Sequence, residues 1–191
     1  MKSRVQLVKD AMECANKTIP TTEKHIYTAF EAGEMLAEYY HADKEIVKIG
    51  LYLMDIKLKE SRKVGKKSEH DLMATDYAKE FLKEYELTND EYETIINCIE
   101  AHHKRVAFNS IEAEICANAD CYRFISPKGV FAYEEFLAIK LDDTKEIVKK
   151  LQAKLEEKHS IISLDKVRDD LEKYYQIFSD LYVTILKDEN M

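Results

Sequence analysis

The sequence has few residues that interrupt helices. Its 191 residues include 4 Gly and 2 Pro, and Trp is absent. A β-sandwich or barrel with many tight turns needs more Gly and Pro than this. The first 20 residues also lack the continuous apolar run of a signal peptide or a membrane span. We therefore expect an all-α protein that stays in the cytoplasm and has no membrane partner.

Cysteine is scarce, and net positive charge is absent. The four cysteines form no CxxC pair, which argues against a zinc ribbon or a disulfide framework and favours buried, reduced thiols. The 29 basic residues are outnumbered by 37 acidic residues, so the formal net charge is −8. This balance argues against a polymeric nucleic acid as partner, although local basic patches remain compatible with it.

Apolar residues recur at intervals of three and four nearly throughout, a pattern typical of amphipathic helices. We predict about eight helices, the first six at about residues 3–17, 23–41, 44–58, 69–85, 88–106 and 110–125. Five positions are expected to begin helices as N-caps: Thr21 or Thr22, Asp43, Ser68, Thr88 with Glu91 as a capping box, and Ser110.

The clearest break in the chain is Ser126–Gly129, and the composition becomes more charged after it. Two long helices are predicted beyond this break, over residues 131–158 and 163–187. We expect them to form a helical hairpin that packs on the main body or pairs with another subunit, which is compatible with a homodimer. The expected division is a helical domain over 1–130 and the hairpin over 131–191.

Several histidines and aspartates lie beside the apolar faces of the predicted helices. A buried carboxylate such as Asp120, in the apolar stretch ICANADCY, needs a cation or hydrogen-bond partner. Taken singly, each residue is explained as a helix cap or a satisfied core group. Taken together, they are explained by one or two shared metal ions. The set is His25, Asp55, His70, His102, His103 and Asp120.

In this order the residues resemble the HD superfamily of metal-dependent phosphohydrolases. The stretch EKHIYTAFEAGEMLAEYYHADKEIVKIGLYLMDIKLKE is similar to its first two motif helices, and SEHDLMATDYAKEFL, IINCIEAHHK and ICANADCYRF are similar to the following ones. The likeness covers about residues 20–140. It implies an HD-domain-like helical bundle with an added C-terminal hairpin. It also implies that the six residues bind one or two divalent ions (Fe, Mn, Zn, Co or Ni), with Asp55 as the catalytic residue.

One position departs from the family pattern. The histidine of the name-giving His-Asp pair is replaced by Met54, and a thioether is a poor ligand for a hard or borderline divalent ion. This leaves two alternatives, a remodelled site that still binds metal or a degenerate site that does not.

A strongly basic stretch follows Asp55. Residues 57–67 contain six Lys or Arg and one Glu, a local charge of +5. We interpret it either as a phosphate-attracting rim, with Lys59, Lys66 and Lys67 binding substrate, or as a solvated loop. Arg123 is a further candidate for phosphate binding, with a surface ion pair as the alternative.

The resemblance therefore implies a metal-dependent phosphohydrolase that acts on a nucleotide or another small phosphate ester. Two alternatives remain. A degenerate relative would bind a ligand or partner without turnover, as Met54 suggests. A di-iron oxygenase of the same fold would leave the lysine-rich stretch unexplained.

Overall fold

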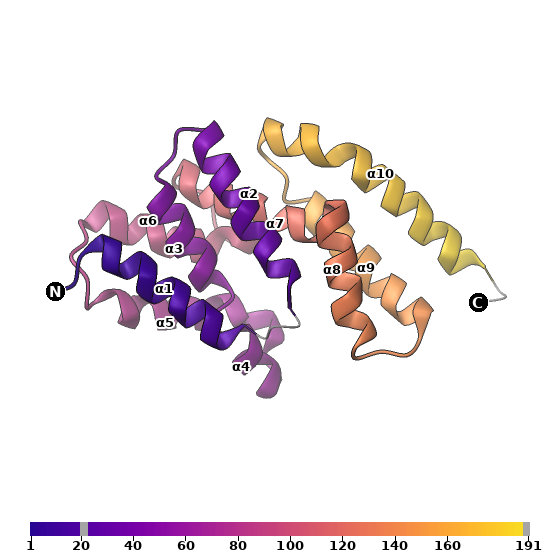
Figure 1. Ribbon diagram of the computed structural model, residues 1–191, viewed down its shortest axis with the longest axis horizontal. Helices are drawn as coiled ribbons and strands as arrows, with labels where there is room; N and C mark the ends of the chain where they lie inside the picture. Colours follow the sequence, from indigo (N-terminus) through magenta and orange to yellow (C-terminus); the bar gives the residue numbers. More distant parts are fainter. Residues whose placement is uncertain (20–22, 189–191) are drawn as a thin grey trace. The chain divides into compact units, whose positions relative to one another are not determined.

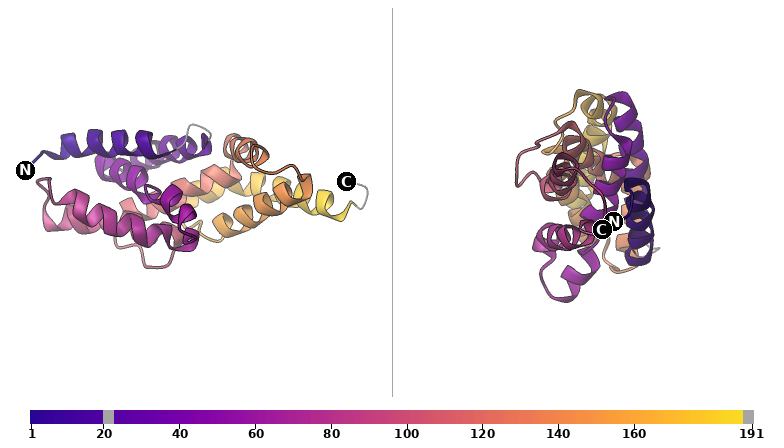
Figure 2. Two further views of the ribbon diagram at one scale, coloured as in Figure 1. Left: turned by 90° about the horizontal axis from the view of Figure 1, so that it is seen from below. Right: turned by 90° about the vertical axis from the view of Figure 1, so that its left-hand side faces the viewer.

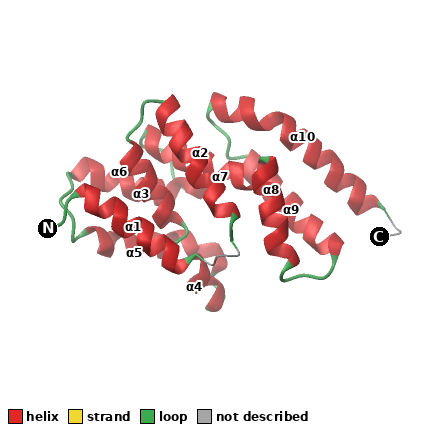
Figure 3. Cartoon of the chain, viewed as in Figure 1, coloured by secondary structure: helices red, strands yellow, loops and turns green. Residues whose placement is uncertain are grey.

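The structure is a computed structural model that describes residues 1–19 and 23–188. The described residues form helices and no strand (Figure 3). The α-helices are α1 (Arg4–Thr18), α2 (His25–Tyr39), α3 (Lys44–Met54), α4 (Leu58–Lys63), α5 (His70–Leu82), α6 (Asn89–Glu100), α7 (Ile111–Ile125), α8 (Pro127–Ala138), α9 (Thr144–His159) and α10 (Asp165–Lys187). The predicted all-α class is thereby confirmed. None of the described helices is both long enough and apolar enough to cross a membrane.

The chain divides into two compact units. Unit 1 contains Met1–Pro20 and Phe30–Ala117, and unit 2 contains Thr21–Ala29 and Asn118–Met191. The division falls within α2 and α7, so each of these helices contributes residues to both units. It differs from the boundary near residue 130 that the composition predicts.

Helix α3 is the centre of unit 1. It packs against α1, α5 and α6, and these helices lie side by side in Figures 1 and 2. Seven of its eleven residues are buried. Gly50 allows the close approach of α6, because a Cβ atom there would lie only 2.6 Å from Cys98 Cβ. This packing fixes the end of α3, where Asp55 lies, against its neighbours.

The predicted caps are mostly confirmed. Asp43 accepts hydrogen bonds from two backbone amides at the start of α3, Thr88 and Glu91 form the capping box of α6, and Ser110 accepts one at the start of α7. The prediction for Ser68 is wrong, because Ser68 lies within a short 3₁₀ turn, η1 (Lys67–Glu69), and α5 has no side-chain cap. Thr21 and Thr22 lie outside the described residues.

Unit 2 is built around α9, which packs against α8 and α10. The single helix predicted over 131–158 is wrong, because the chain breaks between α8 and α9 and Asp143 caps the start of α9. The break at Ser126 is confirmed, since its side chain caps α8 with Pro127 as the first helical residue. The second predicted helix of the hairpin is confirmed as α10.

The N-terminus is tied to the end of α5 by a small polar cluster. Asp10 Oδ2 accepts a hydrogen bond from the Tyr85 hydroxyl at 2.7 Å and lies 3.1 Å from Lys2 Nζ, and Asp10 Oδ1 accepts from Gln6 at 2.7 Å. The bonds from Tyr85, Gln6 and Lys2 lower the pKa of Asp10 to about 2. The Asp10 carboxylate therefore stays ionised in the folded protein at pH values well below the ordinary pKa of aspartate.

This cluster predicts a pH dependence for the Asp10→Asn variant. The folded pKa of Asp10 is depressed, so its stabilising contribution is full above its ordinary pKa of 3.8 and is lost as the pH falls towards 2. The wild type should melt at a higher temperature than Asp10→Asn at pH 6, and this difference should vanish near pH 2. Thermal melts followed by circular dichroism at both pH values measure it. An equal difference at both pH values would contradict the assignment.

Candidate metal centre

Three histidines converge in unit 1. His70 is the first residue of α5, and His102 and His103 lie in the 3₁₀ turn η2 (Ala101–His103) that directly follows α6. One ring nitrogen from each lies within 4.8 Å of the other two. His70 and His102 are buried, whereas His103 is partly exposed. The cluster therefore lies largely away from water, with His103 as its most exposed member.

Backbone carbonyls orient two of these rings. The Nδ1 atom of His70 lies 2.8 Å from the carbonyl oxygen of Lys67, and that of His102 lies 2.6 Å from the carbonyl oxygen of Ile99. A neutral imidazole that donates from Nδ1 to a carbonyl keeps a lone pair on Nε2. This is the arrangement in which histidine binds a metal through Nε2.

Asp55 adds a carboxylate to the cluster. Asp55 is the C-cap residue of α3, and its Oδ1 lies 3.3 Å from His70 Nε2. His70 Nε2 in turn lies 3.1 Å from His103 Nε2. The side chains of Asp55 and His70 are only 6% and 10% exposed, so their interaction takes place largely away from water.

The segment after the histidine pair is fastened to the start of α5. Lys104 adopts the left-handed conformation (φ 58°), which ends η2 and turns the chain. The next residue, Arg105, places Nε 3.2 Å from Asp71 Oδ2 and donates from its guanidinium to the carbonyl of Ser68. Arg105 thereby links the segment that carries His103 to the segment that carries His70.

The donor set fits a divalent transition metal. Imidazole nitrogen suits Zn, Fe, Cu and Ni. His70, His102 and His103 are therefore the residues of unit 1 that could hold an ion together, and the Asp55 carboxylate lies beside His70 as a candidate further ligand.

The other two predicted ligands belong to unit 2. His25, the first residue of α2, is 2% exposed and lies among three aromatic rings, with centroid distances of 5.8, 5.1 and 5.4 Å to Phe124, Tyr133 and Phe136. The roles of His25 and Asp120 as metal ligands stay predictions.

Asp120 is engaged by two cations. Its Oδ1 lies 2.6 Å from Arg123 Nη1 and its Oδ2 lies 2.6 Å from Lys158 Nζ, and all three side chains are at most 4% exposed. The expectation that a buried Asp120 needs a cation or a hydrogen-bond partner is confirmed. The alternative to phosphate binding by Arg123 was an ion pair at the surface. The structure shows an ion pair between Arg123 and Asp120, but this pair is buried.

Lys158 and Arg105 were not predicted from the sequence. The burial of Lys158 could have been predicted, because it follows Leu151 and Leu155 at helical spacing on the apolar face of α9. A lysine on such a face is rarely buried unless it is paired with an acidic group. No local pattern in the sequence predicts the contacts of Arg105, because they join it to Asp71 and Ser68, which lie more than 30 residues away in the chain.

The basic stretch is more ordered than a loop. Residues 58–63 form the short helix α4, which the sequence did not predict because the preceding helix was expected to continue to residue 58. Lys66 Nζ lies 3.5 Å from Glu69 Oε2, and the backbone carbonyl of Lys67 orients the His70 ring. Lys59 is exposed on α4. Substrate binding by Lys59, Lys66 and Lys67 stays a prediction.

Met54 is fully buried at the end of α3, directly before Asp55. If this side chain vacated a ligand position, Met54→His should tighten metal binding by about tenfold or more, because imidazole is the better ligand. The matched control Met54→Leu keeps the apolar volume and should leave the affinity unchanged. Titration of both variants with Zn²⁺ or Mn²⁺ measures the effect. An affinity of Met54→His equal to that of wild type would show that the local geometry no longer accommodates a fifth ligand.

Comparison with known proteins supports the resemblance. No family model matches the chain. A ribonuclease Y from Acidothermus cellulolyticus is 36% identical over 98 residues, which are 51% of this chain but only 18% of that relative. The chain therefore spans less than a fifth of the curated relative that it matches. The crystal structure of a predicted HD superfamily hydrolase from an uncultured Thermotogales bacterium superimposes with a TM-score of 0.63 at 15% identity, covering 93% of this chain and 90% of that one. The chain thus shares the helical fold of that predicted HD superfamily hydrolase, the fold that its motif order implied.

Proposed function

We propose that this protein is a metal-dependent phosphohydrolase of the HD type, acting on a nucleotide or another small phosphate ester. The observation that carries the proposal is the convergence of three histidine ring nitrogens within 4.8 Å, with the Asp55 carboxylate 3.3 Å from one of them. A bound divalent ion supplies Lewis acidity and a water of lowered pKa, which are the requirements of phosphate-ester hydrolysis.

The residues of the site would divide this work. His70, His102 and His103 bind the ion, and the carbonyls of Lys67 and Ile99 fix two of the rings in the metal-binding tautomer. The buried Asp55 carboxylate is placed to accept a proton from the attacking water or to serve as a further ligand. Arg105 keeps the segments of His70 and His103 in register.

The charge near the site supports a phosphate substrate. The +5 stretch over residues 57–67 joins Asp55 to the helix of His70, so it borders the cluster in the chain. Basic side chains raise the local concentration of anions and stabilise phosphoryl oxygens. The name of the ribonuclease relative raises RNA as an alternative substrate. The net charge of −8 favours a small phosphate ester over a polymer.

A second candidate is a metal-binding protein without turnover. The observation that favours it is Met54, which is buried where the family pattern has a metal-binding histidine. Such a protein would bind metal through the same three histidines and hydrolyse nothing.

A hydrolysis screen separates these candidates. Protein loaded with Mn²⁺, Zn²⁺, Fe²⁺, Co²⁺ or Ni²⁺ is assayed against phosphomonoesters, nucleotides and an RNA oligonucleotide. We expect turnover of at least one small phosphate ester, and a loss of at least about tenfold in Asp55→Asn and His103→Ala. The exposed residue His41 supplies the control His41→Asn, because Asn tolerates the left-handed backbone (φ 55°) at that position. Equal rates in the wild type and Asp55→Asn would reject hydrolysis at this site, and cleavage of RNA alone would reject the small substrate.

A further inference from the structure

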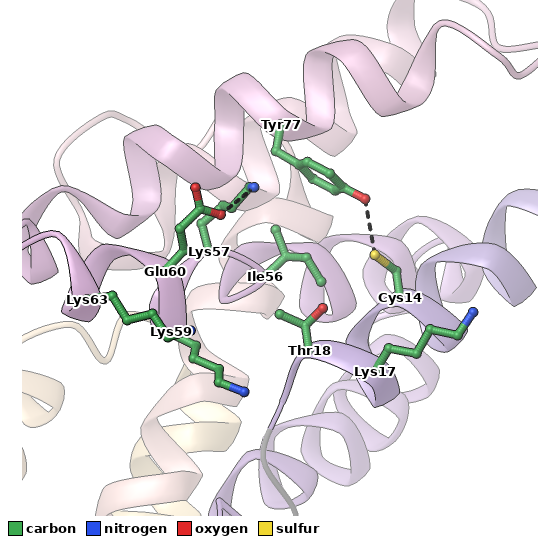
Figure 4. Close-up of a pocket in the computed structure, with 9 residues that line it drawn as sticks. All are labelled: Cys14, Lys17, Thr18, Ile56, Lys57, Lys59, Glu60, Lys63 and Tyr77. Carbon is green, nitrogen blue, oxygen red and sulfur yellow. Dashed lines mark hydrogen bonds and ion pairs between the residues drawn. The ribbon is translucent and has the colours of Figure 1, made fainter.

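A surface pocket of about 370 Å³ lies in unit 1 (Figure 4). It is lined by residues of α1, of the link between α3 and α4, of α4 itself and of α5. Its volume falls within the range of small-molecule sites in proteins. None of the three clustered histidines lines it, so it is a different place from the candidate metal centre.

The lining of this pocket is strongly basic. It contains Lys17, Lys57, Lys59 and Lys63, and its one carboxylate is Glu60. Glu60 lies 2.6 Å from Lys57 Nζ, and Lys17 is paired with Glu13. Lys59 and Lys63 form no ion pair within the described part of the chain. Two uncompensated positive charges therefore face one pocket in a protein whose net charge is −8.

Helix geometry puts these two lysines together. Lys59 and Lys63 are four residues apart on α4, and side chains at this spacing lie on the same face of a helix. Figure 4 shows both on the α4 side of the pocket, across from the α1 residues Thr18 and Lys17, with Ile56 near the centre. An anion bound at this face of α4 is attracted by both positive charges, which together outweigh the repulsion between the two lysines.

The rest of the lining suits an uncharged portion of a ligand. Ile56 is 3% exposed and contributes an apolar surface. The Tyr77 hydroxyl is hydrogen-bonded to Cys14 Sγ at 3.1 Å, and Lys57 Nζ lies 4.9 Å from the centre of the Tyr77 ring. Burial and the bond to Cys14 raise the pKa of Tyr77, so the phenol stays neutral and does not repel an anion.

We propose that this pocket binds a small organic phosphate, with the phosphate between Lys59 and Lys63 and the organic portion against Ile56 and Tyr77. The site is separate from the metal cluster but close to it. Tyr77 lies seven residues after His70 on α5, hence on the same face and about two turns, or about 10 Å, farther along the axis. Binding here requires no metal, so it does not depend on the proposed hydrolytic function.

Titration of metal-free protein tests the proposal. Phenyl phosphate is the probe, with inorganic phosphate and phenol for comparison, in the presence of EDTA and at low ionic strength. We expect phenyl phosphate to bind more tightly than either comparison compound and its affinity to fall as salt is added. In the double variant Lys59→Gln/Lys63→Gln its dissociation constant should rise by roughly five- to twentyfold, because two charge-assisted contacts are removed.

The control variant removes the same charge elsewhere. Lys9 and Lys149 are exposed lysines outside the pocket, and Lys9→Gln/Lys149→Gln should bind phenyl phosphate as the wild type does. His103→Ala should also bind normally, even though it disables the metal cluster. The proposal is overturned if the Lys59/Lys63 variant binds normally, if the control variant loses as much affinity, or if His103→Ala abolishes binding.

Discussion

Replacing Lys158 with alanine is expected to lower the free energy of unfolding by about 3–5 kcal/mol. The Lys158 ammonium is 1% exposed and lies 2.6 Å from Asp120 Oδ2, and its loss leaves a buried carboxylate that is still paired with Arg123 but has lost one of its two cations. Removing one partner of a buried pair costs far more than the pair contributes as a whole, because the other charge cannot regain its hydration. Urea unfolding followed by circular dichroism measures the change.

Two further variants isolate the charge. Lys158→Met keeps an unbranched stem in the core and should lose nearly as much stability as Lys158→Ala. Lys149→Ala, at an exposed position of the same helix, should change stability by less than about 0.5 kcal/mol. A wild-type stability of Lys158→Met would mean that packing, and not the ion pair, is what Lys158 contributes.

The pair of Lys158 and Asp120 is expected to stabilise the fold up to alkaline pH. Burial alone would lower the pKa of Lys158, but the nearby Asp120 and Glu157 outweigh it and raise the pKa above its ordinary value of 10.5. A raised folded pKa contributes stability that is full below 10.5 and is lost as the pH rises through the folded value. Lys158 therefore remains a cation under all ordinary conditions, and its contribution does not vary near neutral pH.

Metal-dependent stabilisation is the second large effect expected. An ion that binds only the folded state at 100 times its dissociation constant stabilises the protein by about 2.7 kcal/mol. Zn²⁺ or Mn²⁺ should therefore raise the melting temperature of EDTA-treated protein by several degrees. This increase should disappear in His102→Asn and His103→Ala, because each removes one of three converging ligands.

His41→Asn provides the control for this effect, since His41 is exposed and lies outside the cluster. It should retain the full metal-dependent increase. Because His102 is buried, His102→Asn is also compared with the wild type in EDTA, so that a general loss of stability is separated from the loss of metal binding. An increase that persists in both histidine variants would place the ion elsewhere.

Much of the fold follows from the sequence because its helices are long, periodic and capped. The Thr88 and Glu91 capping box and the Asp43 cap were predictable, since each is a local pattern of a few residues. Helix α4 was not, because six residues, four of them charged, show no apolar period. The break between α8 and α9 was missed because no Gly or Pro marks residues 139–143, although Asp143 is a local cap signal of the same kind as Asp43.

The candidate site was predictable in part. Placing Asp55 at the end of one helix and His70 at the start of another depended on local patterns and is confirmed. The convergence of His70 with His102 and His103 is a tertiary contact across more than 30 residues, so it was expected from the shared-metal interpretation and the family resemblance and not from a local pattern. The partners of Asp120 were likewise not predictable. The apolar sequence around Asp120 indicates that the buried carboxylate needs a partner, but it does not identify Arg123 and Lys158 as the partners.

The most direct measurement is an anomalous diffraction map of crystals grown with Mn²⁺ or Zn²⁺ after EDTA treatment. The three histidine ring nitrogens, which lie within 4.8 Å of one another, should each lie about 2.0–2.2 Å from a single anomalous peak. Asp55 should lie beside the same peak as ligand or hydrogen-bond acceptor. A map with no peak at His70, His102 and His103, or with its peak at other residues, would contradict a metal centre in this cluster.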